Sequence, residues 1–486
     1  MGTKGRLGNS LFQIASITWI AKTIGTTAVF PKWKYERYFK NKLTRSHKHM
    51  KTLYEPHFHY ADNWFEDFKD YEGWFQSEKY FESKEAVKNL FEFETGFREL
   101  VKAKYRKLFE KETIAISIRR GDFVGNENYE YIPAKYYIGA LLKFDYKDCN
   151  LVFFSDDISY CRTHFECLDN AYFVDADAIE QLCLMTLCEN HIISQSTFSW
   201  WGAYLSESKR VIRPAYNFTE KYKRINDDKD YYPKEWEVFD HKKYFIPLDA
   251  TFIIPVKWDS PDREENFNLC VKTLKNDFDC EILVGEIGDR FKGDFKKLVF
   301  DYPKFHRTKI LNILAKQITG IFINFDADVI IPPMQIYISV EKIKQGADMV
   351  YPYDGRFARV QRKFYQPVLR FLDCGVLSKH SFEGTRAHEL KSYGGAVVFN
   401  RESFFKGGAE NERFISYAPE DVERFERFTR LGFKVERVKG VIYHMDHFIS
   451  LDSYIHHQDY PNNEIELQRV RNLTNEELRD EFNYSL

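Results

Sequence analysis

The chain has 486 residues, which is too long for one hydrophobic core and predicts two or three domains. Its 71 basic and 73 acidic residues nearly cancel, which argues against a nucleic-acid binder because such proteins carry a basic excess. The eight cysteines form no Cys-x-x-Cys pair, so they argue against a zinc site or a dense disulfide framework and favour a reducing compartment.

The N-terminus has some features of a signal peptide, because Lys4 and Arg6 precede an apolar stretch over residues 11–20. Lys22 interrupts that stretch, and no small-residue cleavage site follows cleanly. No run approaches the roughly 20 apolar residues needed to span a bilayer. We therefore expect a cytoplasmic protein without a transmembrane segment, one that can still dock peripherally at a membrane face.

The first half of the chain predicts an open α/β sheet. A glycine-rich loop, a helix and a short strand ending at Pro31 are expected first, and an amphipathic helical pattern follows at 78–109. Three β-branched or apolar segments then read as strands, and each ends in a polar cluster. Ligands bind such sheets at the carboxyl ends of the strands, where these clusters lie. The three expected strands are 113–118, 151–154 and 191–193.

A change of composition divides the chain near its middle. Residues 214–243 are rich in Lys, Asp, Tyr and Pro, which is typical of a linker or docking segment. A second α/β pattern begins at Thr251, with strands expected at 252–256, 281–284 and 320–325, and a charged helix is expected from Leu467. The sequence thus predicts one module over residues 1–240 and another over 245–486.

Paired arginines in the first module favour a diphosphate ligand. Arg119 and Arg120 follow an expected strand, and guanidinium groups bind phosphate oxygens in a bidentate manner. Gly121 lets the backbone approach closely, and Asp122 can orient one arginine. The loop at 5–10 opens a helix, whose N-terminus attracts phosphate. Taken one at a time, each of these elements is more often a surface arginine pair or a tight turn.

The order of five motifs decides between these interpretations. The motifs are GRLGNSLFQIA at 5–15, GWFQSEKYF at 73–81, SIRRGD at 117–122, FFSDD at 153–157 and SQSTFSWWGAYL at 194–205. Together they resemble glycosyltransferase family 11, the α-1,2-fucosyltransferases. The resemblance implies a GT-B-like (Rossmann-type) fold, a GDP-fucose donor, inversion at the anomeric carbon and no metal in this module.

The resemblance also implies roles for individual residues. Arg119 would contribute to catalysis by holding the donor diphosphate, whereas Trp200 and Trp201 are expected to pack in the core. Ser117 stands where the family usually has histidine, and no general base for fucosyl transfer is assigned. The residues expected to bind GDP-fucose are Gly8, Asn9, Arg119, Arg120, Asp122, Asp156, Asp157, Ser196, Thr197 and Ser199.

The second module carries a pair of carboxylates suited to a divalent cation. Asp326 and Asp328 follow the apolar strand at 321–325, where they can share a cation that bridges a diphosphate. The chain has four Asp-x-Asp triplets, at 175, 228, 277 and 326, but only the last has an apolar strand before it and Pro-Pro after it. His444 or His447 can complete the ligand set, although a single histidine is more often structural.

Six segments in order resemble a GT-A-fold transferase of family 2 or of the galactosyl- and N-acetylgalactosaminyltransferase group. They are IIPV at 253–256, EILVGE at 281–286, FDADVIIPP at 325–333, YGGAVVFNRESF at 393–404, APEDVERFER at 418–427 and YHMDH at 443–447. The resemblance implies a UDP-sugar donor and Mn²⁺ or Mg²⁺ held by Asp326, Asp328, His444 and His447.

In that group an acidic pair after Trp-Gly supplies the catalytic base. Here Tyr417-Ala418-Pro419 replaces Trp-Gly, and Asp421 is the expected base with Glu420 as the alternative. The residues expected to bind the UDP-sugar are Pro255, Arg263, Glu286, Asp326, Ala327, Asp328, Gly394 and Gly395.

Two donor sites on one chain predict a bifunctional glycosyltransferase. The second module would add a hexose or N-acetylhexosamine to an oligosaccharide or glycoconjugate acceptor, and the first would cap it with α-1,2-linked fucose. Two alternatives stay open: only one module is active, or the chain is a carbohydrate-binding scaffold derived from a transferase.

Overall fold

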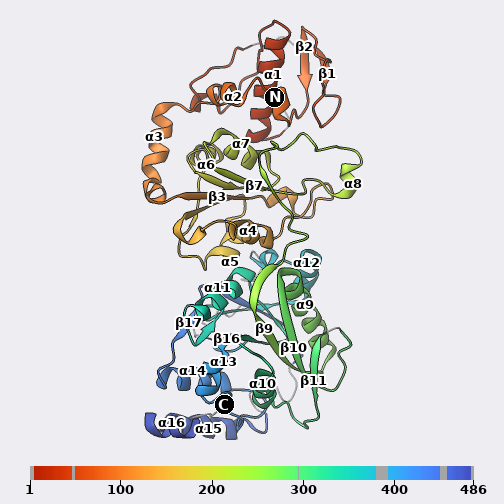
Figure 1. Cartoon of the computed structure of the whole chain (residues 1–486). Coiled ribbons are helices and arrows are strands. Elements are labelled where there is room, and N and C mark those ends of the chain that lie inside the picture. The colour runs from red at the N-terminus through yellow and green to blue at the C-terminus, as the bar shows by residue number, and fades with distance from the viewer. Residues whose placement is uncertain (1–4, 46–49, 294, 379–391, 449–456, 483–486) are drawn as a thin grey trace. The chain divides into compact units, whose positions relative to one another are not determined.

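The computed structural model describes residues 5–45, 50–293, 295–378, 392–448 and 457–482 (Figure 1). The chain divides into two compact units. Unit 1 comprises Met1–Cys161 and Asp169–Tyr244, and unit 2 comprises Arg162–Leu168 and Phe245–Leu486. Within the described ranges, no helix combines the length and apolarity needed to cross a bilayer.

Unit 1 is built on a six-stranded sheet in which every neighbouring pair of strands is parallel. The strand order is β5-β4-β3-β6-β7-β8. The strands are β3 (Thr113–Ile118), β4 (Asn150–Ser155), β5 (Ala171–Phe173), β6 (Asn190–Ile192), β7 (Arg210–Pro214) and β8 (Glu237–Phe239).

The central strands form where the sequence predicts them. All six residues of β3 are buried, as expected for a continuous apolar strand that is covered on both faces. The expected strand at 113–118 matches β3, the expected strand at 151–154 lies inside β4, and the expected strand at 191–193 overlaps β6. The helices of this region are α4 (Ala134–Leu141), α5 (Ile158–Phe165), α6 (Ala178–Met185) and α7 (Thr197–Leu205).

The N-terminal segment adds an aromatic layer to unit 1. Helix α1 (Leu7–Thr23) packs on α7, and the ring of Phe12 lies 4.5 Å from Trp200 and 4.9 Å from Trp201. Both tryptophans are fully buried, which confirms their expected core role. The short strand expected before Pro31 is reduced to an isolated bridge between Phe30 and Arg45. A two-stranded parallel sheet also forms here, from β1 (Lys51–Tyr54) and β2 (Lys69–Glu72).

Two expectations for unit 1 are corrected. The single helical pattern at 78–109 is broken into the short helices η2 (Glu78–Tyr80), α2 (Lys84–Leu90), α3 (Thr95–Lys104) and η3 (Arg106–Glu110). Residues 214–243 are not a free linker, because β8 extends the sheet and Tyr231 and Trp236 are buried. This segment also holds α8 (Glu220–Lys223). Its polar composition hid the few aromatic side chains that anchor it.

Unit 2 contains a seven-stranded sheet in the order β11-β10-β9-β12-β16-β14-β17. Strand β16 is antiparallel to both of its neighbours, and the other pairs are parallel. The strands are β9 (Ile246–Lys257), β10 (Phe278–Ile287), β11 (Lys296–Phe300), β12 (Ile321–Phe325), β14 (Met349–Tyr351), β16 (Ala396–Asn400) and β17 (Val435–Arg437). The expected strands at 252–256, 281–284 and 320–325 lie within or overlap β9, β10 and β12.

A smaller three-stranded sheet and a set of helices complete unit 2. The small sheet has the order β13-β18-β15, from β13 (Val329–Ile330), β18 (Val441–Met445) and β15 (Arg356–Val360). The C-terminal helices α15 and α16 follow one another beside α14 (Figure 1). The helices are α9 (Pro261–Asp277), α10 (Arg307–Lys316), α11 (Pro333–Lys344), α12 (Tyr365–Phe371), α13 (Arg401–Lys406), α14 (Glu420–Arg430), α15 (Tyr460–Asn472) and α16 (Asn475–Phe482), with the short turns η6 (Arg362–Phe364) and η7 (Cys374–Leu377).

Each main sheet has a point where the strand order reverses. In unit 1 the chain proceeds from β3 through β4 to β5 on one side, and β6, β7 and β8 lie on the other side. In unit 2 it proceeds from β9 through β10 to β11, whereas β12 lies on the opposite side of β9. Ligands bind open α/β sheets at such switch points, beyond the carboxyl ends of the strands. The structure therefore points to the loops after β3 and β6, and to those after β9 and β12.

Candidate active sites

In unit 1, the loop after β3 places a charged network at the switch point. Arg119 pairs with Asp122, and its Nη1 lies 2.5 Å from Asp156 Oδ2 at the end of β4. Arg6 Nη2, from the loop before α1, lies 3.1 Å from Asp122 Oδ1. Gly121 has φ of +28°, and a Cβ at this position would lie 2.3 Å from Asp156 Oδ2. Glycine is therefore required for the close approach between the two strand ends.

The two neighbouring arginines have different environments. Arg120 is 4% exposed, and its guanidinium carbon lies 3.9 Å from the centre of the Tyr160 ring and 4.9 Å from that of Tyr131. The Arg119 side chain is 11% exposed and lies between the carboxylates of Asp122 and Asp156. Of the expected arginine pair, Arg119 thus pairs with carboxylates at the switch point, whereas Arg120 supports the loop by cation–π contacts.

The loop of Gly8 and Asn9 lies against the start of α7. Asn9 Oδ1 accepts hydrogen bonds from Thr197 Oγ1 at 2.8 Å and from Gln76 Nε2 at 3.2 Å. A Cβ at Gly8 would lie 2.7 Å from the backbone of Thr197 and Phe198. The N-terminal ends of α1 and α7 thus meet closely because Gly8 has no side chain. Gln76 was not among the expected site residues, and its place in the GWFQSEKYF motif was the available signal.

Three other expected residues in unit 1 are used by the fold. Asp157 Oδ1 accepts from Tyr160 N at 3.3 Å in the first turn of α5, and Ser196 Oγ accepts from Phe198 N at 3.2 Å as the cap of α7. Ser199 is fully buried, and its hydroxyl donates to the carbonyl of Ser196 at 2.8 Å. These bonds shape the loops, so direct nucleotide contacts from Ser199 are not supported by its position.

In unit 2, a carboxylate and two imidazoles meet at the end of β12. Asp328, His444 and His447 place one potential ligand atom each within 4.8 Å of the others. His444 Nε2 lies 3.5 Å from Asp328 Oδ1, and His447 Nε2 lies 3.3 Å from Asp328 Oδ2. Asp328 belongs to the loop between β12 and β13, and β18 pairs with β13, which brings His444 and His447 to the carboxylate.

His447 presents one ring nitrogen to the backbone and the other to Asp328. His447 Nδ1 donates a hydrogen bond to the carbonyl oxygen of Phe448, 2.7 Å away, and its Nε2 lies on the side of Asp328. Arg263 Nη2 is farther from Nδ1, at 3.4 Å, and Arg263 Nη1 pairs with Asp328. Burial would raise the pKa of Asp328, but His444, Arg263 and His447 outweigh it and lower that pKa. Asp328 is therefore ionised.

Arg307 is a site residue that the sequence interpretation missed. It opens α10, is 8% exposed, and places Nη2 2.7 Å from Asp326 Oδ1. Its Nη1 lies 3.6 Å from Glu420 Oε1 and 3.7 Å from Asp421 Oδ1. Burial would lower the pKa of Arg307, but these three carboxylates raise it. An arginine that starts the helix before the Asp-x-Asp strand was the available signal.

Asp326 therefore differs from Asp328 in its partner. Of the four expected metal ligands, Asp328, His444 and His447 form one cluster, whereas Asp326 pairs with Arg307. Burial raises the pKa of Asp326 despite that arginine. Sequence spacing placed both carboxylates at one strand end. It could not show that Asp326 pairs with Arg307 whereas Asp328 pairs with Arg263.

The acidic pair at the start of α14 faces a glycine turn. Asp421 Oδ1 accepts from Arg424 Nη2 at 2.5 Å, and a Cβ at Gly394 would lie 2.7 Å from Asp421 Oδ2. Gly395 has φ of +90°, and its carbonyl accepts from Asp326 N at 2.8 Å. Glu420 is 6% exposed, and burial together with Asp421 raises its pKa to about 8. Of the two carboxylates, Asp421 is thus the one against the glycine turn.

Three residues that were expected to bind the UDP-sugar have side chains that are buried in unit 2. Glu286 is fully buried and accepts from Trp258 Nε1, Phe291 N and Lys297 Nζ, so its carboxylate organises the loop after β10 and is not free to bind uracil or ribose. Pro255 is buried inside β9, and Ala327 is 4% exposed. For these two, only backbone atoms remain for a ligand.

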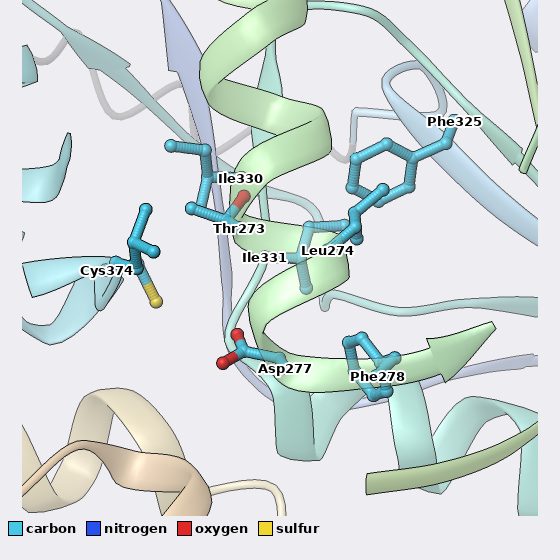
Figure 2. A pocket seen from close by; sticks show the side chains of 9 residues that line it. Thr273, Leu274, Asp277, Phe278, Phe325, Ile330, Ile331 and Cys374 are labelled. Carbon is cyan, nitrogen blue, oxygen red and sulfur yellow. The ribbon is translucent and has the colours of Figure 1, made fainter. Parts of the chain in front are cut away.

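A separate small pocket lies between the end of α9, the loop after β12 and the turn η7 (Figure 2). Asp277 is the one charged side chain among its nine lining residues. None of the arginines, histidines or paired carboxylates described above lines this pocket. It is therefore not part of either candidate site.

Comparison with known proteins identifies unit 1. The model of glycosyl transferase family 11 matches residues 1–240. The O-antigen biosynthesis glycosyltransferase WbnK of Escherichia coli is 32% identical over 124 residues, which are 23% of this chain and 41% of that protein. The α-1,2-colitosyltransferase of E. coli is 36% identical over 104 residues, which are 19% of this chain and 36% of that protein. The match thus spans about two fifths of the length of these relatives.

Solved structures show weaker likenesses. GalNAc-T7 with UDP, GalNAc and Mn²⁺ has a TM-score of 0.32 at 12% identity and covers 48% of this chain and 50% of its own. A Drosophila β-1,4-galactosyltransferase 7 mutant with manganese, UDP-Gal and xylobiose has a TM-score of 0.27 at 14% identity. The match covers 39% of this chain and 65% of that protein. Likenesses this low do not identify a fold, so only the geometry of unit 2 supports its candidate site.

Proposed function

Because residues 1–240 belong to glycosyltransferase family 11, we propose that the chain is a bifunctional glycosyltransferase. Unit 1 would transfer fucose from GDP-fucose in an α-1,2 linkage with inversion, on a GT-B-like scaffold. Unit 2 would transfer a hexose or N-acetylhexosamine from a UDP-sugar in a metal-dependent reaction, on a GT-A-like scaffold. Together they would build a fucosylated glycan on an oligosaccharide or glycoconjugate.

The arrangement of Arg119 supports the proposal for unit 1. Arg6 and Arg119 share Asp122 at the switch point, beside the loop of Gly8 and Asn9. A donor diphosphate can replace the carboxylates as the partner of these arginines, since guanidinium binds phosphate oxygens at least as well. A relative that is 36% identical over 104 residues is named an α-1,2-colitosyltransferase, so a colitosyl donor is the second candidate.

The proposal for unit 2 rests on one observation, the cluster of Asp328, His444 and His447. Each imidazole Nε2 lies 3.3–3.5 Å from one oxygen of the Asp328 carboxylate, and one ligand atom from each residue lies within 4.8 Å of the others, as a shared ion requires. Carboxylate with imidazole is a donor set that Mn²⁺ accepts. A cation held there would neutralise charge on the departing diphosphate.

The surrounding residues supply the other parts of the reaction. Asp421, against the glycine turn at Gly394, would take the proton of the acceptor hydroxyl while the hydroxyl oxygen attacks the anomeric carbon. The bond from that carbon to the UDP oxygen would break in line with the attack. Arg307 would hold Glu420 and Asp421 beside Asp326, and Arg263 would turn from Asp328 to a diphosphate oxygen.

The deciding assay measures release of GDP and UDP. The purified chain is incubated with GDP-fucose, a GDP-linked colitose donor, UDP-glucose, UDP-galactose, UDP-GlcNAc and UDP-GalNAc, with Mn²⁺ or with EDTA. We expect GDP release to survive EDTA and UDP release from one donor to depend on Mn²⁺. Asp328→Ala should abolish UDP release alone, and Arg119→Ala should abolish GDP release alone. Loss of both activities in either variant, with the fold intact, would contradict the two-site proposal.

A further inference from the structure

The loop that leads into α14 is held in an unfavourable backbone conformation. Ser416 has φ of +66° and Ala418 has φ of +47°, both in the left-handed region that non-glycine residues avoid. Such a conformation is unfavourable for a residue that has a Cβ, and it persists only where the surroundings enforce it. Only Pro419 separates Ala418 from Glu420 and Asp421, so the strain lies just before the acidic pair.

One buried side chain from α15 supplies much of this enforcement. Asn463 is 1% exposed, and its Nδ2 donates to the carbonyls of Ile415 at 2.8 Å and Ala418 at 2.9 Å, with a longer contact to Tyr417 at 3.4 Å. Its Oδ1 accepts from Ile415 N at 3.3 Å. A single amide thus binds the backbone on both sides of the strained residues.

Neighbouring residues hold the same loop from two directions. His457 Nδ1 accepts from Asp459 N at 3.1 Å, so Nε2 carries the proton and donates to the Tyr417 carbonyl at 2.7 Å. On the other side, Ser416 N donates to the carbonyl of Phe305 at 3.1 Å. Phe305 lies two residues before Arg307. The loop is therefore fixed between α15 and the segment that positions Arg307.

We propose that Asn463 is a positioning residue for sugar transfer in unit 2. By holding Ile415, Tyr417 and Ala418, it sets where α14 begins and keeps Glu420 and Asp421 opposite Arg307. The C-terminal helix α15 is thereby part of the catalytic apparatus, although Asn463 itself touches no reacting group. This inference rests on the function proposed for unit 2.

The expected effect is on turnover and not on donor binding. The cation cluster and Arg263 lie on β18 and the loop that follows it, on α9 and in the loop after β12, and none of the bonds described for them above involves Asn463. A displacement of about 1 Å at a catalytic group can cost about a hundredfold in rate. Asn463→Ala should therefore lower kcat while leaving the affinity for UDP nearly unchanged.

The test compares Asn463→Ala with Asn411→Ala in the full chain. Asn411 is a matched control because it is 6% exposed and its Nδ2 bonds α15 through Glu466 Oε1 at 2.7 Å, without contacting the strained residues. Three readouts are taken: Mn²⁺-dependent UDP release from the fastest UDP-sugar of the panel, the Kd of UDP with Mn²⁺ by calorimetry, and hydrogen exchange of the peptide covering 413–420.

We expect Asn463→Ala to lower kcat at least about tenfold, to change the Kd of UDP less than about twofold, and to speed exchange of the loop. Asn411→Ala should leave kcat within about twofold of the original. Equal losses in both variants, or a parallel loss of UDP binding, would overturn the positioning role. If Asn463→Ala does not fold, His457→Phe, which removes one bond to the Tyr417 carbonyl, should show the same split with a smaller effect.

The two proposals fail in different ways. If no UDP-sugar turns over in the original chain, the function of unit 2 is wrong, and the inference that rests on it is wrong with it. If UDP release is present but loop exchange and kcat are unaffected in Asn463→Ala, only the role of Asn463 is wrong.

Discussion

Replacing Glu420 by glutamine should stabilise unit 2, and the gain should grow with pH. In the unfolded chain this carboxyl loses its proton near pH 4.5, whereas burial and Asp421 raise its pKa in the folded chain to about 8. Between these values the unfolded state binds fewer protons, so the free energy of unfolding falls as the pH rises. Glutamine has nearly the same shape and cannot ionise, so it removes this penalty.

The size of the effect follows from the distance between the two pKa values. Each unit of difference between the folded and unfolded pKa corresponds to about 1.4 kcal/mol. A rise from 4.5 to about 8 therefore lowers the free energy of unfolding by at most about 5 kcal/mol at pH 8.5. Part of the shift belongs to the pair with Asp421, so we expect a gain of about 2–4 kcal/mol. At pH 4.5 the gain should be near zero, because the folded and unfolded states are then similarly protonated.

Urea unfolding at pH 4.5, 6.5 and 8.5 measures this dependence. The transition of unit 2 is followed through hydrogen exchange of peptides from residues 245–486, because two compact units need not unfold together. Glu426→Gln, on the same helix and in a partly exposed pair with Arg471, is the control and should show no gain that rises with pH. If Glu420→Gln is no more stable than the original chain at pH 8.5, the buried-acid explanation is wrong.

Three further predictions follow from the two candidate sites. His447→Gln should weaken Mn²⁺ binding about 10- to 100-fold, as measured by calorimetry, and an unchanged affinity would show that this imidazole is not a ligand. Gly394→Ala should reduce Mn²⁺-dependent UDP release about a hundredfold, because the added Cβ lies 2.7 Å from Asp421 Oδ2. The thermal unfolding temperature should change little, and a large drop would assign the glycine to folding instead. In unit 1, Arg119→Ala should abolish GDP binding with little change in stability, whereas Arg120→Ala should lower the free energy of unfolding by about 2 kcal/mol. The reverse pattern in binding and denaturation experiments would contradict the two environments seen here.

Local patterns predicted the strands well and the edges of the units poorly. Apolar, β-branched segments such as 113–118 form strands because burial on both faces requires such residues. Residues 214–243 were expected to be a linker or docking segment, because polar composition conceals an edge strand that a few aromatic side chains anchor. The helical pattern at 78–109 was broken by tertiary packing, which no local propensity reports.

In the candidate sites, too, the sequence predicted the motifs, whereas the contacts of single side chains depend on the fold. The motif SIRRGD predicted a phosphate-binding loop, but only the fold shows that Arg119 faces carboxylates and Arg120 lies between aromatic rings. The Asp-x-Asp triplet predicted a cation site. Glu286 was expected to bind the donor, but in the fold its carboxylate accepts hydrogen bonds from its own loop and from Lys297.

By itself, the sequence determined the two-module plan, the α/β class of each module and the residue types available at each strand end. These follow from composition and from spacing along the chain, which local physical rules can interpret. Only the tertiary structure decided which side chains meet. Arg307 joins Asp326 to Glu420 and Asp421 across 94 residues, and Asn463 reaches back to a strained loop 45 residues earlier. Such contacts depend on how strands are ordered in a sheet and on which helix covers which loop, and no periodicity along the chain records that order.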